Sequence, residues 1–283
     1  SLDPNKLYMI DIPKLSHRVS FELNQNMEVE NNIMNNKIYD YILLCFFLGN
    51  DFMPHFPALN IRTNGIQILM ETYSSIFTDT NESIVLNQEI QWKNIRKLIS
   101  SIAENEEEFI INEYLSRNKQ EKHYIKANTP EEKLDKLNRL PTLERNEEHY
   151  INPTLPGWQS RYYERLFHME INDERRKQIC FNYMEALEWT MKYYTSGCVD
   201  WRWKYKYNYA PLLEDLVKYI PYFQTSLFKQ QNNNVVSPYT QLSYVLPRSS
   251  LNLLPKHIET NLLKKHPEWY DENISICWCF CKY

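Results

Sequence analysis

The sequence predicts a helix-rich α/β fold. Apolar residues recur at helical spacing through most of the chain, and one segment carries them at positions i, i+3, i+4 and i+7: Ile66, Leu69, Met70 and Tyr73. The candidates for extended structure are short, namely residues 7–12, 201–209 and 277–283. A chain of 283 residues can form one large domain or two, and either could bury a substantial core.

The composition excludes several classes of protein. A formal net charge of −4 argues against a uniformly basic nucleic-acid-binding protein, although a nuclease that works through metal ions needs carboxylates. With four glycines, the chain cannot build a Rossmann fingerprint or a P-loop. No apolar run has the length of a membrane span, so we expect no membrane partner. The six cysteines form no disulfide framework, which predicts a reducing compartment. We expect the cytoplasm, with the nucleus left open.

The first elements are a short extended segment and two helices. Residues 7–12 (LYMIDI) predict a strand or a buried segment, and Pro13 suits the first turn of the helix that follows. Residues 24–36 are polar and rich in asparagine, which predicts a loop or a ragged helix end. Residues 37–48 predict a buried helix, because YILLCFFL is continuously apolar.

Two further helical regions follow. Thr63 or Asn64 offers an N-cap to a helix at residues 66–77. The apolar spacing over residues 92–115 predicts one long helix or two. The charge run at residues 104–108 is expected to face solvent.

The second half begins after a charged segment. Residues 117–149 are dense in Lys, Glu and Asn, which predicts a charged insertion or a solvent-facing hairpin and marks the best domain boundary. Residues 173–194 predict a long helix with Asp173 as its N-cap and Gly197 beyond its end. Residues 238–246 predict a last helix, which Pro247 ends.

The tail alternates as a strand would. Its cysteines would share one face of that strand: Cys277, Cys279 and Cys281. Their spacing is not that of a zinc site, so a structural role is expected.

The stretch GNDFMPHFP, residues 49–57, places a carboxylate directly after the buried helix. Gly49 can adopt the left-handed conformation that ends a helix, so the chain leaves at a defined angle. Asp51 would be a poor helix cap, because the C-terminal dipole repels an anion. Local chemistry favours a turn residue. A metal ligand remains open, because Mg²⁺ prefers a hard oxygen that is held in place.

An aromatic ribbon lies in the second half. Aromatic residues occupy every second position, at Trp201, Trp203, Tyr205, Tyr207 and Tyr209, and polar or basic residues lie between them, at Arg202, Lys204, Lys206 and Asn208. If the ribbon is extended, its aromatic face could stack on the bases of a single strand. It could equally be a core strand with cations toward solvent, which we favour for the tyrosines.

The string DYILLCFFLGNDFMPHFPALNIRTNGIQILMETY, residues 40–73, resembles the Xrn-type 5′→3′ exoribonuclease family, the Xrn and Rat enzymes. Its helix-Gly-x-Asp-aromatic arrangement also resembles the wider flap-endonuclease superfamily. Four other segments resemble family motifs in the family's order: LYMIDIPKLS, GWQSRYYERLF, EALEWTMKYYTSGCVDWRWKYKYNYAP and SPYTQLSYVLPRSSLNLLP.

The resemblance implies a domain organisation. Residues 1–116 would be the helical C-terminal part of a flap-nuclease or PIN-like core, and residues 117–150 a charged linker or insertion. Residues 151–283 would be a second conserved region, mainly helical with short strands and truncated at its end. The family's other metal carboxylates and its 5′-phosphate pocket precede the LYMIDIPKLS segment. We therefore expect the missing N-terminal part of the core to be a partner, and this chain alone to be inactive.

The implied function is processive hydrolysis of single-stranded RNA that bears a 5′-monophosphate, giving nucleoside monophosphates. Two divalent ions, Mg²⁺ or Mn²⁺, would act in the reaction. By resemblance Asp51 is a metal ligand, and Trp201 or Trp203 lines the path of the incoming strand. Lys206 and Asn208 depart from the proline and histidine common in the family.

Several other residues are candidates on chemical grounds. Arg62 and Asn64 could contact a phosphate near a helix N-terminus, or Arg62 could pair with Glu71. His55 is expected to be a buried, hydrogen-bonded histidine rather than a ligand. Further carboxylates are Asp11, Asp40 and Glu71, but Asp11 is expected to start a helix and Asp40 to lie in a first helical turn.

Two alternatives remain. One is a structure-specific DNA endonuclease of the flap superfamily, against which the second region argues because it resembles exoribonucleases only. The other is a non-catalytic RNA-binding relative. An acidic cluster upstream of Ser1 would distinguish a catalytic protein from the latter.

Overall fold

A computed structural model of the chain describes residues 6–24, 31–78, 80, 82–121, 128–138, 145–230 and 234–270. The expected strand with Cys277, Cys279 and Cys281 lies outside these residues. Within them the protein is helix-rich, as predicted, and its strands form one short antiparallel hairpin. No helix in these ranges is long and apolar enough to cross a membrane.

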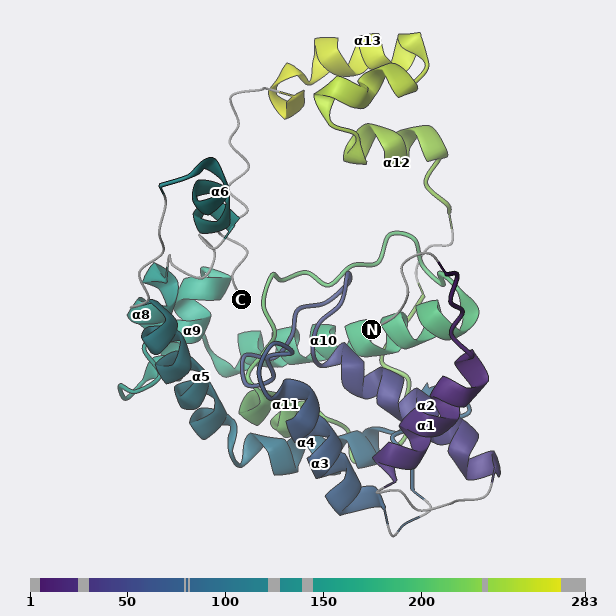
Figure 1. Cartoon of the computed structure of the whole chain (residues 1–283), viewed down its shortest axis with the longest axis vertical. Helices are drawn as coiled ribbons and strands as arrows, with labels where there is room; N and C mark the ends of the chain where they lie inside the picture. Colours follow the sequence, from purple (N-terminus) through teal and green to yellow (C-terminus); the bar gives the residue numbers. More distant parts are fainter. Residues whose placement is uncertain are drawn as a thin grey trace.

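The elements are named in chain order (Figure 1). They are α1 (Ile12–Leu23), α2 (Asn31–Phe46), α3 (Gly65–Phe77), β1 (Val85–Leu86), β2 (Glu89–Ile90), α4 (Trp92–Ala103), α5 (Glu106–Glu121), α6 (Pro130–Asn138), α8 (Asn146–Ile151), α9 (Trp158–Phe167), α10 (Asp173–Ser196), α11 (Leu213–Tyr219), α12 (Pro238–Val245), η1 (Arg248–Leu253), α13 (Lys256–Lys265) and η2 (Pro267–Tyr270).

The main core joins the two halves of the sequence. Helices α2, α3 and α4 pack with α10 and α11, and their apolar faces form one buried cluster. Its fully buried members include Leu43, Leu44, Phe47, Phe56, Leu69, Tyr73, Trp92, Leu98, Tyr183, Leu187 and Leu216. Residues 37–48 are thus a buried segment as predicted, and the long helix α10 forms the other wall of the core.

Two smaller clusters lie outside the main core. Aromatic residues of α9 pack around Leu212 and Ile151, and Trp158 and Tyr163 are among them. The C-terminal elements form their own small core of Leu251, Leu254 and Tyr270. In Figure 1 these elements, α12 and α13, are the yellow-green group at the top.

Buried charges fasten the hairpin to the helices. Asp40 is fully buried in the middle of α2, where its Oδ1 accepts a 2.7 Å hydrogen bond from the Val85 amide and its Oδ2 accepts one from the Tyr73 hydroxyl. Lys37 donates to the same hydroxyl and to the Glu82 carbonyl. Burial raises the pKa of Asp40 to about 6 and lowers that of Lys37. The expectation that Asp40 lies in a first helical turn is wrong, because α2 begins at Asn31.

The predicted solvent-facing charge run separates two helices, α4 and α5, but one of its members is buried. The carboxylate of Glu106 accepts hydrogen bonds from the backbone amides of Leu213 and Glu214, at 2.7 and 2.9 Å, and so caps α11. The pKa of Glu106 is raised to about 7, mainly by burial. The negative charges of Glu214 and Asp215 also raise this pKa, whereas the hydrogen bonds from the two backbone amides lower it.

The raised pKa of Glu106 predicts a pH-dependent stability. Between about pH 4.5 and pH 7 the folded chain keeps a proton that the unfolded chain releases, so the free energy of unfolding falls as pH rises. The largest change in the free energy of unfolding that this one group can cause over that range is about 3 kcal/mol. Glu106→Gln should remove this part of the pH dependence in urea unfolding at pH 5 and pH 7.5. The exposed Glu108→Gln is the control and should behave as wild type.

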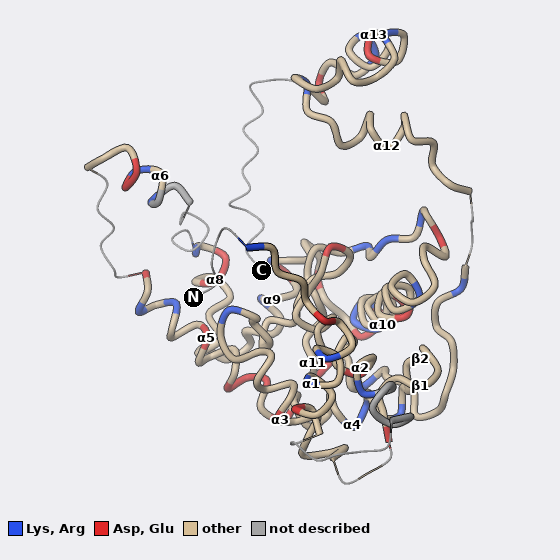
Figure 2. Tube along the Cα trace, turned by 45° about the vertical axis from the view of Figure 1, so that its right-hand side comes forward, with Lys and Arg blue, Asp and Glu red and all other residues tan. Residues whose placement is uncertain are grey.

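The charged segment at residues 117–149 contains an ordered ion-pair network in its described parts. Arg145 is almost fully buried and contacts Glu148, Glu121 and the Asn118 side chain. Arg117 also pairs with Glu148. The described part of this segment includes helices α6 and α8. Elsewhere acidic and basic positions are interspersed along the chain (Figure 2).

Two details at the helix ends differ from expectation. Residues 7–11 form no strand within the described chain, and Leu7, Met9 and Ile10 are exposed, because no described segment pairs with or covers them. Asp11 caps α1 as expected, accepting from the Lys14 amide at 3.1 Å. Asn172 caps α10 in place of Asp173, which is the first helical residue.

Candidate metal and nucleic-acid interface

The loop after α2 is built on a side-chain turn. Asn50 Oδ1 accepts hydrogen bonds from the backbone amides of Phe52 and Met53, at 2.9 and 3.2 Å. The backbone amide of Asn50 donates to the Met53 carbonyl. Asp51 lies inside this turn with an exposed side chain. The turn fixes the backbone that carries Asp51, because two side-chain bonds and one backbone bond close it.

Gly49 makes this turn possible. Its φ is +87°, and a Cβ placed there would lie 3.0 Å from the His55 backbone nitrogen. A side chain at this position would therefore be strained twice, by the left-handed backbone and by the close approach of His55.

Gly49→Ala should therefore destabilise the protein by about 2–4 kcal/mol, since overpacking adds to the backbone cost. Gly157→Ala is the matched control: its φ is +76°, but the nearest atom is the end of the Arg161 side chain at 3.7 Å. It should lose about 1 kcal/mol. Equal losses in urea unfolding would contradict the role of the His55 contact.

Of the four carboxylates named in the sequence analysis, Asp51 is the one without a hydrogen bond to a described residue. Asp51 presents an exposed carboxylate, the kind of oxygen that Mg²⁺ binds. Asp11 and Asp40 are engaged in the bonds given above, and Glu71 accepts from Gln67 at 2.7 Å. No three His, Cys, Asp or Glu side chains in the described ranges gather into a metal site. The chemistry of the Asp51 carboxylate suits a metal ligand, but the described residues alone do not assemble a complete metal site around it.

The Asp51 loop is fastened to α10 of the second half. The Phe52 ring lies edge-on to Trp189 and Tyr193, with ring centroids 4.9 and 4.8 Å apart. Tyr183 donates to the Pro54 carbonyl at 2.9 Å, and the Thr190 hydroxyl lies 3.7 Å from the Met53 sulfur. These contacts join residues about 130 positions apart in the sequence.

The same helix holds the start of the aromatic ribbon. Trp189 stacks on Trp203 with a centroid distance of 5.5 Å, and its indole Nε1 donates to the Asp200 carbonyl. Trp203 is half-buried, whereas Trp201 is 45% exposed. Of the two predicted tryptophans, Trp201 has the more accessible ring, and Trp203 joins the stack beside the Asp51 loop.

The rest of the ribbon is not a strand. Its burial alternates as the sequence suggests, with Tyr205 buried and Lys204 and Lys206 exposed. However, side chains rather than a partner strand hold its backbone: Asn182 Oδ1 accepts from the Lys206 amide at 2.9 Å. The tyrosines pack into the core, as favoured above, and Tyr205 contacts Tyr183.

Arg62 and Asn64 lie on a separate turn. Asn60 organises it, since its Oδ1 accepts from the Arg62 amide and its carbonyl from the Gly65 amide. Asn64 is the N-cap residue of α3 but makes no side-chain capping bond. Both predicted side chains are exposed.

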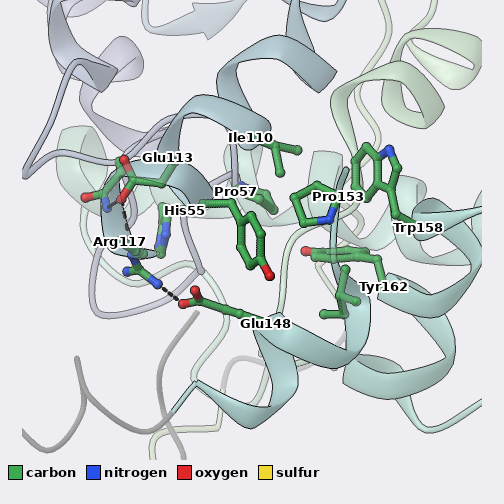
Figure 3. A pocket seen from close by; sticks show the side chains of 12 residues that line it. His55, Pro57, Ile110, Glu113, Arg117, Glu148, Pro153, Trp158 and Tyr162 are labelled. Atoms are coloured by element: carbon green, nitrogen blue, oxygen red, sulfur yellow. Dashed lines mark hydrogen bonds and ion pairs between the residues drawn. The ribbon is translucent and has the colours of Figure 1, made fainter. Parts of the chain in front are cut away.

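His55 lines a pocket between the loop after α2 and helices α5, α8 and α9 (Figure 3). Burial lowers the pKa of His55, and the positive charge of the nearby Arg117 lowers this pKa further. The negative charge of Glu113 acts in the opposite direction. The ring was expected to be buried and hydrogen-bonded; it is half-buried, and within the described chain it has no hydrogen-bond partner. The cavity measures about 60 Å³, and Arg117 bridges Glu113 and Glu148 at its rim.

Sequence reasoning missed two residues, Asn50 and Trp189, that position the Asp51 turn and the start of the aromatic ribbon. Asn50 lies in the quoted GND stretch, and an Asn before an Asp at a helix end is a recognisable turn signal. Trp189 sits at an apolar position of a predicted helix, where nothing distinguishes it from an ordinary core residue. Its two-sided contact follows only from the tertiary packing.

Comparison with known proteins places the chain in a family. The family described as "Xrn1 helical domain" matches residues 32–152 and residues 116–268, which together cover most of the chain. Among curated proteins, "5'-3' exoribonuclease 1" of Homo sapiens is 29% identical over 262 residues, covering 79% of this chain and 15% of its own length. "5'-3' exoribonuclease 2" of Arabidopsis thaliana is 22% identical over 299 residues.

Coverage of the relatives is partial. The Arabidopsis match covers 77% of this chain and 29% of the relative. A shorter match, to "5'-3' exoribonuclease 2" of Schizosaccharomyces pombe, is 35% identical over 124 residues and covers 42% of the chain and 12% of the relative. The chain thus spans about a third or less of the length of these proteins. Because the family match extends over most of its residues, the chain belongs to the Xrn family, whose helical domain it contains.

Proposed function

We propose that this chain is part of a 5′→3′ exoribonuclease that degrades single-stranded RNA bearing a 5′-monophosphate, processively, to nucleoside monophosphates. The observation that carries the proposal is the Xrn1 helical domain match over residues 32–268, which includes the fixed turn of Asp51. The curated relatives named above are exoribonucleases, which favours RNA over a DNA flap as substrate.

Asp51 would serve as a ligand to Mg²⁺ or Mn²⁺. When bound, two such ions supply a clamp for the attacking and leaving oxygens of the phosphodiester. Asp51 is suited to this role because its turn is closed by Asn50 while its own carboxylate stays free of described hydrogen bonds. One carboxylate cannot balance two divalent cations, so the other ligands would come from the preceding part of the same nuclease core, where the flap-nuclease or PIN-like fold would be completed.

The RNA would approach from the side of the ribbon. The exposed Trp201 ring offers a base a face to stack on, and Trp203 supports the same loop. Arg62 and Asn64 would contact backbone phosphates at the start of α3. We expect a cytoplasmic or nuclear protein.

The proposal is tested by RNA decay. The complete nuclease that contains this chain should release mononucleotides from 5′-phosphorylated RNA with Mg²⁺, and far more slowly from RNA with a 5′-hydroxyl. EDTA should stop the reaction. The 283 residues alone should release none. Equal decay of the two RNAs, or endonucleolytic products, would overturn the proposal.

A further inference from the structure

Two turns of the same design contact Trp189 of α10. In the first, Asn50 Oδ1 accepts from the Phe52 and Met53 amides, at 2.9 and 3.2 Å. In the second, Asp200 Oδ1 accepts from the Arg202 and Trp203 amides, at the same two distances. The residue after the acceptor is exposed in each turn, so Asp51 and Trp201 occupy equivalent positions.

Trp189 contacts both turns. On one side its ring meets the Phe52 ring edge-on, at 4.9 Å and 72°. On the other side it stacks on Trp203, at 5.5 Å and 23°, and its Nε1 donates to the Asp200 carbonyl at 3.1 Å. The side chain is only 5% exposed, so it is not itself a surface for RNA.

We propose that Trp189 is a positioning residue that holds the Asp51 turn and the Trp201–Trp203 turn at a fixed spacing. This rests on the proposed function, in which the first turn carries a metal ligand and the second guides the RNA. A stacked base and the phosphodiester to be cut belong to one RNA chain, so the distance between the two turns sets which phosphate reaches the metals. The Trp189 indole is held by the Phe52 ring, the Trp203 ring and the Asp200 carbonyl, so it fixes that distance better than an aliphatic side chain could.

Other contacts hold only one turn. Thr190 and Tyr183 reach the Asp51 loop, at Met53 and Pro54, and Asn182 reaches the ribbon beyond the second turn, at Lys206. Loss of Trp189 should therefore loosen both turns together, whereas loss of another buried tryptophan should loosen neither.

The first arm of the test needs no catalysis. Hydrogen exchange is measured on the 283-residue chain for wild type, Trp189→Leu, Trp189→Phe and Trp158→Leu. Trp158 is the matched control, because it is equally buried and its Nε1 also donates, to Glu107, but it packs in the α9 cluster. We expect tenfold or faster exchange at residues 50–53 and 200–203 in Trp189→Leu, a smaller rise in Trp189→Phe, and none at either turn in Trp158→Leu.

The second arm uses the complete nuclease. Trp189→Leu should lower kcat on 5′-phosphorylated RNA by about 10- to 100-fold, because small misplacements of reacting groups have effects of this size. KM should change little, Trp189→Phe should recover most of the rate, and Trp158→Leu should stay near wild type.

The two arms separate the two proposals. If only one turn exchanges faster in Trp189→Leu, if neither does, or if Trp158→Leu has the same effect, the coupling is overturned even when the nuclease is active. An unaltered kcat in Trp189→Leu overturns it too. A wild-type nuclease that does not degrade the RNA overturns the proposed function instead, and the exchange result still decides whether Trp189 joins the turns.

Discussion

Asp51→Ala will lower RNA hydrolysis by the complete nuclease by about 10²–10³-fold or more, the scale seen when one preorganised group that stabilises developing charge is removed. This follows from the proposed function, in which Asp51 is a metal ligand at the fixed turn after α2. The thermal midpoint should not change, because the Asp51 side chain is exposed and makes no hydrogen bond to a described residue. Mononucleotide release under single-turnover conditions measures the rate.

A second exposed carboxylate provides the control. Glu71 lies on α3 and contacts only Gln67 among its described hydrogen-bond partners. Glu71→Ala should keep the wild-type rate within about threefold, since an exposed carboxylate that holds no metal contributes little. If Asp51→Ala keeps the same rate as Glu71→Ala, Asp51 is a turn residue and no ligand.

Lys37→Met will destabilise the protein by about 3–5 kcal/mol, the largest effect on stability that we expect from one substitution. Lys37 is 1% exposed and donates to Tyr73 and to the Glu82 carbonyl. Its removal leaves the Asp40 carboxylate buried without its cation. Urea unfolding at pH 7.5, where the carboxylate is ionised in the folded chain, measures the loss.

Two further variants isolate the buried charge as the cause. Lys37→Met combined with Asp40→Asn should regain part of the lost stability, because neither charge then remains. Arg18→Met removes one partner of an exposed pair, Arg18 with Glu22, and should lose less than about 1 kcal/mol. If Lys37→Met is as mild as Arg18→Met, the buried pair does not fasten the hairpin.

The sequence predicted those features that depend on neighbours along the chain. Helical spacing predicted α3, α4 and α10, and the apolar run predicted the buried end of α2. Gly49 predicted the turn that presents Asp51, because a left-handed residue at a helix end has a local signature.

Features that depend on distant partners were not predictable. Asp40 was expected in a first helical turn and Glu106 in a solvent-facing run. Their buried partners, Val85 and Leu213, lie 45 and 107 positions away. Residues 7–12 are a mainly apolar run that predicted a strand or a buried segment, but an apolar run does not itself supply a partner. The contacts of Trp189 with both turns likewise depend on tertiary packing.

Anomalous diffraction from crystals of the complete nuclease soaked in Mn²⁺ tests the central claim most directly. The account predicts a Mn²⁺ peak at about 2.0–2.6 Å from a carboxylate oxygen of Asp51, the range of metal–oxygen bonds for such ions. Further acidic ligands would come from the preceding part of the core. A Mn²⁺ peak bound elsewhere, with the Asp51 carboxylate in solvent, would contradict it.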